Sequence, residues 1–165
     1  MPRVRSQESA SQGVTILRRL LDSRPIQCGV LVGCPTEQGV YALWLADEPP
    51  VCLKVGIAGP RRGKGLAERL RLHCRSNRGN SVLARHLAAD LSSTWTHGYD
   101  FSRRSERRVF LARRCYFRVV PVPGASRQGL LALEEFLCSQ LRPRYIGRVP
   151  QNRVICSGPE VRRRV

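Results

Sequence analysis

Acidic residues are scarce in this sequence, and lysine is scarcer still. Twelve Asp and Glu stand against twenty-nine Lys and Arg, which gives a formal net charge of +17 over 165 residues, and Lys54 and Lys64 are the only lysines. Such a surplus fits a polyanionic partner, because each phosphate that a cation neutralises releases counterions. Arginine also makes two-pronged contacts to phosphates and guanine edges, which lysine does not. We therefore expect contact with nucleic acid of some kind; a merely soluble basic surface or an RNA-associated structural role is the alternative.

Paired cysteine motifs and long apolar runs are also missing. None of the seven cysteines stands in a C-x-x-C pair, and an odd number leaves no complete disulfide framework. Most lie inside apolar runs, where a free thiol behaves as a small hydrophobe, and a zinc site from Cys28, Cys34 and a distant histidine is the alternative. No signal peptide or stretch of membrane-spanning length is visible. We therefore expect a reduced, soluble, cytoplasmic protein with no membrane partner.

The chain is long enough for one domain with a real core and too short for two comfortable ones. Its first thirteen residues are rich in Ser, Gln and Arg and are expected to fray. A short helix is predicted over Val14–Leu21, and residues 26–32 fit a strand or a buried connector. We expect residues 1–38 to form an N-terminal extension and residues 148–165 a basic C-terminal tail.

Two apolar runs predict a β-hairpin. The runs are Gly39–Leu45 and Val51–Ile57, and both have the composition of strands. The segment Asp47–Pro50 between them has the composition of a turn. One register places Tyr41 directly across from Lys54, although the turn is long enough to leave this open. Tyr116–Val122 is β-branched and aromatic and supplies a third strand. The predicted fold class is therefore α/β (α+β), with a small three-stranded antiparallel sheet and flanking helices.

A helix over Leu66–Arg75 carries two residues that need an explanation. Arg69 and His73 lie one turn apart and fall on the inward arc, away from the solvent side. A second helix is predicted over Val82–Leu91, with Asn80 or Ser81 as its N-cap. His86 lies within the apolar arc of that helix, where a satisfied core histidine and a functional one are both open.

Two basic segments are candidates for contacts with nucleic acid. In the glycine-rich turn from residue 60 to 65, backbone amides and cations could hold a phosphate, and a solvated basic loop is the alternative. Between residues 92 and 114, aromatics stand beside arginines, as in single-strand binding, although an arginine-coated helix that packs its aromatics into the core needs no ligand. The candidate residues are Arg61, Arg62, Lys64, Arg103, Arg104, Arg107 and Arg108, with Asn152 in the tail.

A helix over Leu130–Leu141 places a carboxylate among apolar residues. Glu134 falls in the middle of the leucine stripe, whereas Glu135 falls on the solvent side. A carboxylate on a buried face is costly unless a cation or a donor meets it. A simple ion pair with one of the many arginines is one explanation. A metal-binding or catalytic role is the other, and it would also account for the inward Arg69 and His73.

Together these motifs resemble the GIY-YIG nuclease superfamily over residues 39–147, with an insertion near residues 95–114. The matches are Gly39-Val40-Tyr41 for the first triplet, Lys54-Val55-Gly56 for the second, Arg69 and His73 on the first helix, Glu134 on its own helix, and Pro143-Arg144-Tyr145 after it. The chain departs from the family pattern twice. Lys54 replaces the tyrosine of the second triplet, and Ile146 stands where the family tends to have an asparagine, Asn152 being the nearest one.

The resemblance implies a divalent-metal-dependent endonuclease that hydrolyses DNA, of restriction, mobile-element, repair or defence type. One Mg²⁺ or Mn²⁺ per site would bind Glu134, and Arg69 would brace the phosphate. Tyr41 would position or deprotonate water, His73 would take or relay the proton, and Lys54 would keep Tyr41 acidic. A catalytically inactive nucleic-acid-binding relative is the alternative. Cutting both strands with one site per chain requires two subunits or two visits, so a homodimer is a further expectation.

Overall fold

The computed structural model describes residues 3–59, 65–79, 81–90 and 98–147. Its elements are, in chain order, α1 (Arg3–Asp22), β1 (Ile26–Gln27), β2 (Gly39–Leu45), β3 (Val51–Ala58), α2 (Leu66–Cys74), α3 (Val82–Ala89), α4 (Arg104–Arg114), β4 (Cys115–Pro121) and α5 (Arg127–Leu141). The strands form one antiparallel sheet in the order β1-β4-β2-β3. The α+β class is therefore confirmed.

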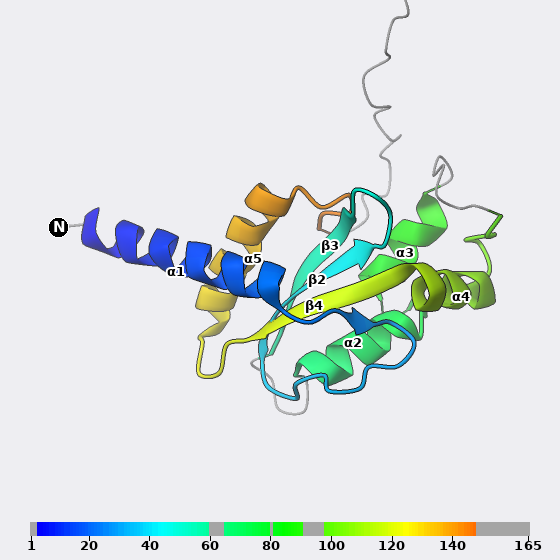
Figure 1. Cartoon of the computed structure of the whole chain (residues 1–165), viewed down its shortest axis with the longest axis horizontal. Helices are drawn as coiled ribbons and strands as arrows, with labels where there is room; N and C mark the ends of the chain where they lie inside the picture. Colours follow the sequence, from blue (N-terminus) through cyan, green and yellow to red (C-terminus); the bar gives the residue numbers. More distant parts are fainter. Residues whose placement is uncertain (1–2, 60–64, 80, 91–97, 148–165) are drawn as a thin grey trace, which may run out of the picture.

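The sheet is buried on both faces, and β2 shows why. Tyr41, Leu43 and Leu45 pack with side chains of α2, α3 and α4, whereas Val40 and Ala42 pack with α1 and α5. Successive side chains of a strand point to opposite faces, so one apolar strand can serve both cores. Figure 1 shows the sheet between these two groups of helices.

The hairpin is present, but its register differs from the predicted one. Tyr41 lies opposite Gly56, and Lys54 lies opposite Leu43. The pairing shifts next to Leu43, where Trp44 pairs with Cys52, so β3 carries one extra residue at this point. Such a bulge is invisible to a strict two-residue alternation. The register that placed Tyr41 across from Lys54 is wrong.

The sheet has four strands, so the prediction of three is wrong. The additional strand is β1, whose two residues pair with Phe117 and Tyr116 of β4. A two-residue strand is too short to show any alternation of polarity, and for this reason the sequence left residues 26–32 between strand and connector.

Helix α1 begins at Arg3, so it starts well before the predicted start at Val14. The segment holds helix-forming Gln, Glu and Ala and no glycine before Gly13. A side chain at Gly13 would approach the Phe136 ring to 2.8 Å, so glycine allows α1 to lie close to α5. The N-terminal half of α1 projects beyond the sheet, at the left of Figure 1.

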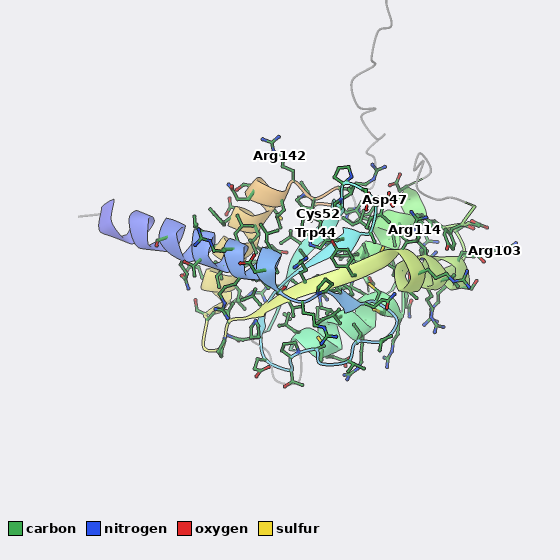
Figure 2. The ribbon with its side chains drawn as sticks, in the orientation of Figure 1. Trp44, Asp47, Cys52, Arg103, Arg114 and Arg142 are labelled. Atoms are coloured by element: carbon green, nitrogen blue, oxygen red, sulfur yellow. The ribbon has the colours of Figure 1, made fainter. Side chains whose placement is uncertain are left out.

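The inserted segment folds against the body of the domain. Tyr99 and Phe101 lie edge-on to Phe110 of α4, and both phenylalanines are buried in the core. At the other end of α4, Arg114 Nη2 lies 2.7 Å from Asp47 Oδ1 in the turn between β2 and β3 (Figure 2). These described aromatics therefore serve packing, whereas Trp95 and His97 lie outside the described residues.

The described helices and cysteines bear on two further expectations, the lack of a membrane-spanning helix and the zinc alternative. No described helix combines the length and apolar character needed to span a bilayer. The six described cysteines are all free thiols. Within the same residues, no group of three or more His, Cys, Asp and Glu side chains has a metal-binding arrangement, so the zinc alternative finds no support there.

Candidate functional site

Four predicted catalytic residues line one cavity of about 510 Å³ at the β3 edge of the sheet. They are Tyr41 of β2, Lys54 of β3, Arg69 of α2 and Glu134 of α5. The carboxyl half of β3 supplies the floor, from Gly56 to Gly59. Residues up to 93 positions apart in the sequence thus meet because α2 and α5 both pack beside the hairpin. We refer to this cavity as the cleft.

Tyr41 lies across β3 at the position where that strand has no side chain. A Cβ at Gly56 would come within 2.4 Å of the Tyr41 hydroxyl oxygen. The glycine of the Lys54-Val55-Gly56 triplet is therefore required by the packing of the Tyr41 ring. Phe117 meets the same ring edge-on, at a centroid separation of 6.0 Å. These contacts hold the phenol in one orientation, with its oxygen at the cleft.

A buried chain of hydrogen bonds runs away from the cleft behind Tyr41. The Tyr41 hydroxyl lies 2.6 Å from Nε2 of His73, and Nδ1 of His73 lies 3.0 Å from Oγ of Ser81. Ser81 is the N-cap of α3, and its Oγ accepts a hydrogen bond from the Ala84 amide. Burial lowers the pKa of His73 to about 3, and the positive charges of Arg69 and Lys54 add to the effect. The imidazole is therefore neutral at physiological pH.

Arg69 enters the cleft with a donor unused. Its Nε is buried and has no hydrogen-bond partner among the described residues. The guanidinium also interacts with the Tyr41 hydroxyl and opposes the effect of burial, which raises the pKa of that phenol. A buried donor without a partner costs free energy unless a ligand or water supplies the acceptor. The Nε edge of the Arg69 guanidinium can thus donate to an anionic group in the cleft.

Lys54 and Glu134 both line the cleft, and each affects the pKa of the other. Lys54 is only 7% exposed, and desolvation lowers the pKa of its amine although Glu134 opposes this. Desolvation likewise raises the pKa of Glu134, against the effects of Lys54, Arg69 and Arg127. No ion pair of Glu134 is formed within the described residues. Within those residues, the explanation of Glu134 as half of a simple ion pair therefore finds no support.

Arg127 is a cleft residue that the sequence reasoning missed. It stands in the first turn of α5, lines the cleft and lowers the pKa of Glu134. It precedes Glu134 by seven positions, which is close to two full helical turns and therefore the same face. The signal was present in the sequence, but the predicted helix began at Leu130 and so excluded Arg127. The Ser126 cap that starts α5 earlier accepts from the Gly129 amide.

The donor set of the cleft fits one divalent ion only with help from the substrate. Glu134 is the one carboxylate among the described residues that line the cleft. Magnesium is commonly held by one or two carboxylates, several waters and the phosphate oxygens of the substrate. Three cations already surround Glu134, so an ion would bind more favourably once a phosphate has entered. The residues are consistent with an ion that is shared between Glu134 and a phosphate.

The candidate contacts to nucleic acid divide into three groups. Arg61, Arg62, Lys64 and Asn152 lie outside the described residues. Arg103, Arg104 and Arg108 are exposed on or beside α4, and none of them lines the cleft. Arg103 reaches outward at the far end of α4 (Figure 2) and pairs with Asp100 at 3.2 Å. The exposed arginines, Arg103, Arg104 and Arg108, are therefore available to a polyanion.

Arg107 is a correction to that prediction. Its side chain is 2% exposed, and its nitrogens donate to the carbonyl oxygens of Phe101, Ser102 and Ser76 and to the Ser76 hydroxyl, at 2.6–3.2 Å. A guanidinium whose donors are satisfied inside the protein is not free to contact a phosphate. Arg107 instead ties α4 to the end of α2, and its arginine neighbours in the sequence gave no sign of this.

The start of α2 offers little to the predicted phosphate-binding turn. The amides of Leu66 and Ala67 donate to the carbonyl oxygens of Glu37 and Pro35 at 2.8 and 2.9 Å. A Cβ at Gly65 would lie 1.6 Å from the Thr36 carbonyl oxygen, so this backbone approach requires glycine. These two amides of the helix N-terminus are therefore already used within the protein, whereas residues 60–64 of the predicted turn lie outside the described residues.

The residues after α5 form a structural cluster. The Tyr145 hydroxyl donates to Asp90 at 2.7 Å, and Arg144 Nε donates to the same carboxylate at 2.8 Å. His86 stacks on the Tyr145 ring and contacts the Gly147 carbonyl oxygen through Nε2. His86 is thus a satisfied core histidine, one of the two explanations left open by the sequence. Ile146, which follows Tyr145, is exposed.

Comparisons of the chain with protein-family models, with curated proteins and with solved structures gave no match.

Proposed function

We propose that the chain is a divalent-metal-dependent endonuclease of the GIY-YIG type that hydrolyses phosphodiester bonds in DNA. The observation that supports this is the convergence of Tyr41, Lys54, Arg69 and Glu134 on one cleft, with His73 hydrogen-bonded to Tyr41. Phosphodiester hydrolysis requires a positioned water, neutralisation of developing negative charge and help for the leaving oxygen. The cleft contains a group suited to each of these tasks. The net charge of +17 supplies the attraction to the polyanion.

Binding comes first, and Arg69 and Arg127 carry it. The unpartnered Nε of Arg69 directs a donor to a non-bridging phosphate oxygen, and Arg127 adds a second cation on the α5 side. Charge on the non-bridging oxygens rises as water attacks, so a fixed guanidinium stabilises the transition state more than the bound substrate. Glu134 would hold the Mg²⁺ or Mn²⁺ ion. When bound, this ion polarises the phosphate and stabilises the departing 3′ oxygen.

Tyr41 and Lys54 handle the attacking water. Burial keeps the Tyr41 phenol protonated at neutral pH, so its hydroxyl orients the water from the floor of the cleft. Lys54, whose pKa is lowered by burial, accepts the proton of the water when its amine is neutral. His73 is a poor resting place for that proton, because its imidazolium is strongly disfavoured. The lysine in place of the motif tyrosine therefore takes over part of the proton transfer.

Incubation with supercoiled plasmid and MgCl₂ tests the proposal. We expect nicked or linear products from the wild-type protein and none after EDTA is added. Glu134→Gln should remove cleavage, whereas Glu135→Gln, one position along α5 and exposed, should retain it. Binding of DNA without cleavage under all metal conditions would leave the catalytically inactive alternative. Equal activity of the two glutamate variants would show that the cleft is not the active site.

A further inference from the structure

Behind the cleft, Ser81 contacts the ring of His73. This side chain is wholly buried, stands eight residues after His73 and contacts its Nδ1 from the start of a different helix. Serine at a helix N-cap has an ordinary structural purpose, because its oxygen accepts a backbone amide hydrogen. The additional contact to the histidine ring is not needed for that purpose. This contact determines which ring nitrogen of His73 carries the hydrogen, which capping alone does not control.

The hydrogen-bond donors available at Ser81 determine which ring nitrogen of His73 carries the hydrogen. The Ser81 oxygen already accepts from the Ala84 amide at 3.2 Å. Its own hydroxyl hydrogen needs an acceptor in a site with no exposed surface, and among the described residues only Nδ1 of His73 lies in reach, at 3.0 Å. If Nδ1 carried the hydrogen instead, the serine hydroxyl would be left buried without an acceptor. The hydroxyl therefore donates to Nδ1.

The neutral ring then holds its single hydrogen on Nε2, which faces the Tyr41 oxygen at 2.6 Å. We propose that Ser81 is a positioning residue, which holds His73 in the Nε2–H tautomer so that the imidazole donates a hydrogen bond to Tyr41. The Tyr41 oxygen then accepts from His73 and interacts with Arg69, and its own hydrogen is directed to the cleft. This reverses the direction of proton transfer that the sequence motifs suggested for His73. The histidine acts as a fixed donor and does not collect a proton.

The consequence for the proposed reaction is a defined hydrogen-bond direction at the floor of the cleft. A phenol that receives hydrogen bonds from behind donates its own hydrogen forward, to the oxygen of a water or phosphate. It is also better able to share its proton in the transition state, because developing charge on its oxygen is met by fixed donors. The inference rests on the proposed function for this kinetic consequence only. The tautomer itself is a property of the resting protein.

Two variants of Ser81 separate capping from donation. Ser81→Ala removes both, whereas Ser81→Asp keeps an acceptor for the Ala84 amide and removes the hydrogen that the hydroxyl gives to Nδ1. The matched control is Ser126→Ala, which removes the N-cap of α5 at a similar distance from the Gly129 amide, 3.0 Å, and has no contact to the His73 ring. Thermal unfolding of Ser81→Ala and Ser126→Ala measures the cost of losing a cap. Ser81→Asp is unfolded beside them as the variant that keeps its cap.

The tautomer is read from the ¹⁵N resonances of the His73 ring in the full chain, with His73→Gln for assignment. We expect the hydrogen on Nε2 in the wild-type protein and in Ser126→Ala, and on Nδ1 in Ser81→Asp. In plasmid cleavage, Ser81→Asp and Ser81→Ala should lower kcat by about tenfold to 100-fold with KM changed less than about twofold. Ser126→Ala should cleave at the wild-type rate once its stability is allowed for.

The two arms of this experiment fail separately. A wild-type protein that cleaves no DNA overturns the proposed function, while the ring spectrum still decides the tautomer. A wild-type ring with its hydrogen on Nδ1 overturns the inference, whatever the activity. So does a Ser81→Asp protein that retains both the wild-type spectrum and the wild-type kcat.

Discussion

Arg107 is buried and Arg69 is half-buried, and their guanidinium groups lie in opposite surroundings. Arg107 gives its hydrogens to the carbonyl oxygens and the hydroxyl around the end of α2, whereas Nε of Arg69 is buried without a partner in the described part of the chain. Asp90 and Glu134 repeat the contrast among the carboxylates. Asp90 accepts from Arg144 and Tyr145, whereas Glu134 has cations nearby but no ion pair within the described residues.

This difference separates groups that stabilise the fold from groups that await a ligand. Buried polar groups in native proteins are almost always hydrogen-bonded, and the exceptions are concentrated at functional sites. One region of the molecule, around Ser76 and Asp90, follows the rule. The cleft departs from it. Nε of Arg69 is a buried donor without a described partner, Glu134 has no ion pair within the described residues, and Lys54 is a desolvated amine. The comparison therefore predicts that the two regions will respond to mutation in opposite ways.

The largest expected effect is the loss of activity in Arg69→Ala. Removing a fixed donor to a developing oxyanion lowers kcat by about 10²–10³-fold, which is about 2.7–4 kcal/mol. The unfolding midpoint should stay close to that of the wild-type protein, because Nε has no described hydrogen-bond partner and the Tyr41 oxygen keeps its contact with His73. Plasmid cleavage and thermal unfolding measure the two quantities. Arg71→Ala is the matched control, since Arg71 lies two positions away on α2 and is exposed; equal losses in both variants would break the comparison.

The opposite pattern is expected for Arg107→Met. The variant keeps an apolar chain of similar length but leaves the carbonyl oxygens of Phe101 and Ser76 buried without their donor. We expect a loss of about 2–4 kcal/mol in the free energy of unfolding by denaturant, because each unsatisfied buried group costs about 1–3 kcal/mol. The folded fraction should retain the wild-type kcat. The exposed neighbour gives the control Arg108→Met, and a stable Arg107→Met protein without activity would reverse the assignment.

A smaller loss is expected for Asp90→Asn. An amide oxygen in place of Oδ2 can still accept from Arg144 Nε and Tyr145, but these bonds are no longer charge-assisted, and the amide NH₂ in place of Oδ1 faces the Nη2 donor of Arg144. The free energy of unfolding should fall by about 1–3 kcal/mol, with cleavage unaffected in the folded protein. Glu134→Gln should do the reverse, losing cleavage at unchanged or raised stability, since it removes a desolvated charge. Chemical denaturation of the two variants side by side tests this pair.

The parts of the site that the sequence predicted are those that periodicity determines. The inward faces of Arg69, His73 and Glu134 followed from 3.6 residues per turn, and the hairpin followed from its two apolar runs. The bulge that sets Tyr41 against Gly56 and the short strand β1 did not, because both depend on pairing between distant segments. Arg107 and Ser81 show the same limit. Their importance lies in which atoms of other elements meet them, and a run of arginines or an N-cap signal carries no information on that.

The smallest expected effect is a dependence of stability on pH from His73, which lies behind the cleft, and it sharpens the comparison there. The pKa of His73 falls to about 3 in the folded protein, below the ordinary value of 6.5. Between these values the unfolded chain binds more protons than the folded one, so the free energy of unfolding rises with pH across this window. The contribution is at most about 1.4 kcal/mol per pH unit. Glu134 works against it, because its raised pKa makes the folded state the better proton binder just above pH 4.5. Urea unfolding between pH 4 and 7 should show a steeper slope for wild-type protein than for His73→Gln, and a steeper slope still for Glu134→Gln. If His73→Gln left the slope unchanged, the folded protein would protonate the imidazole as readily as the unfolded chain does, and Tyr41 would lose its neutral donor below about pH 6.5.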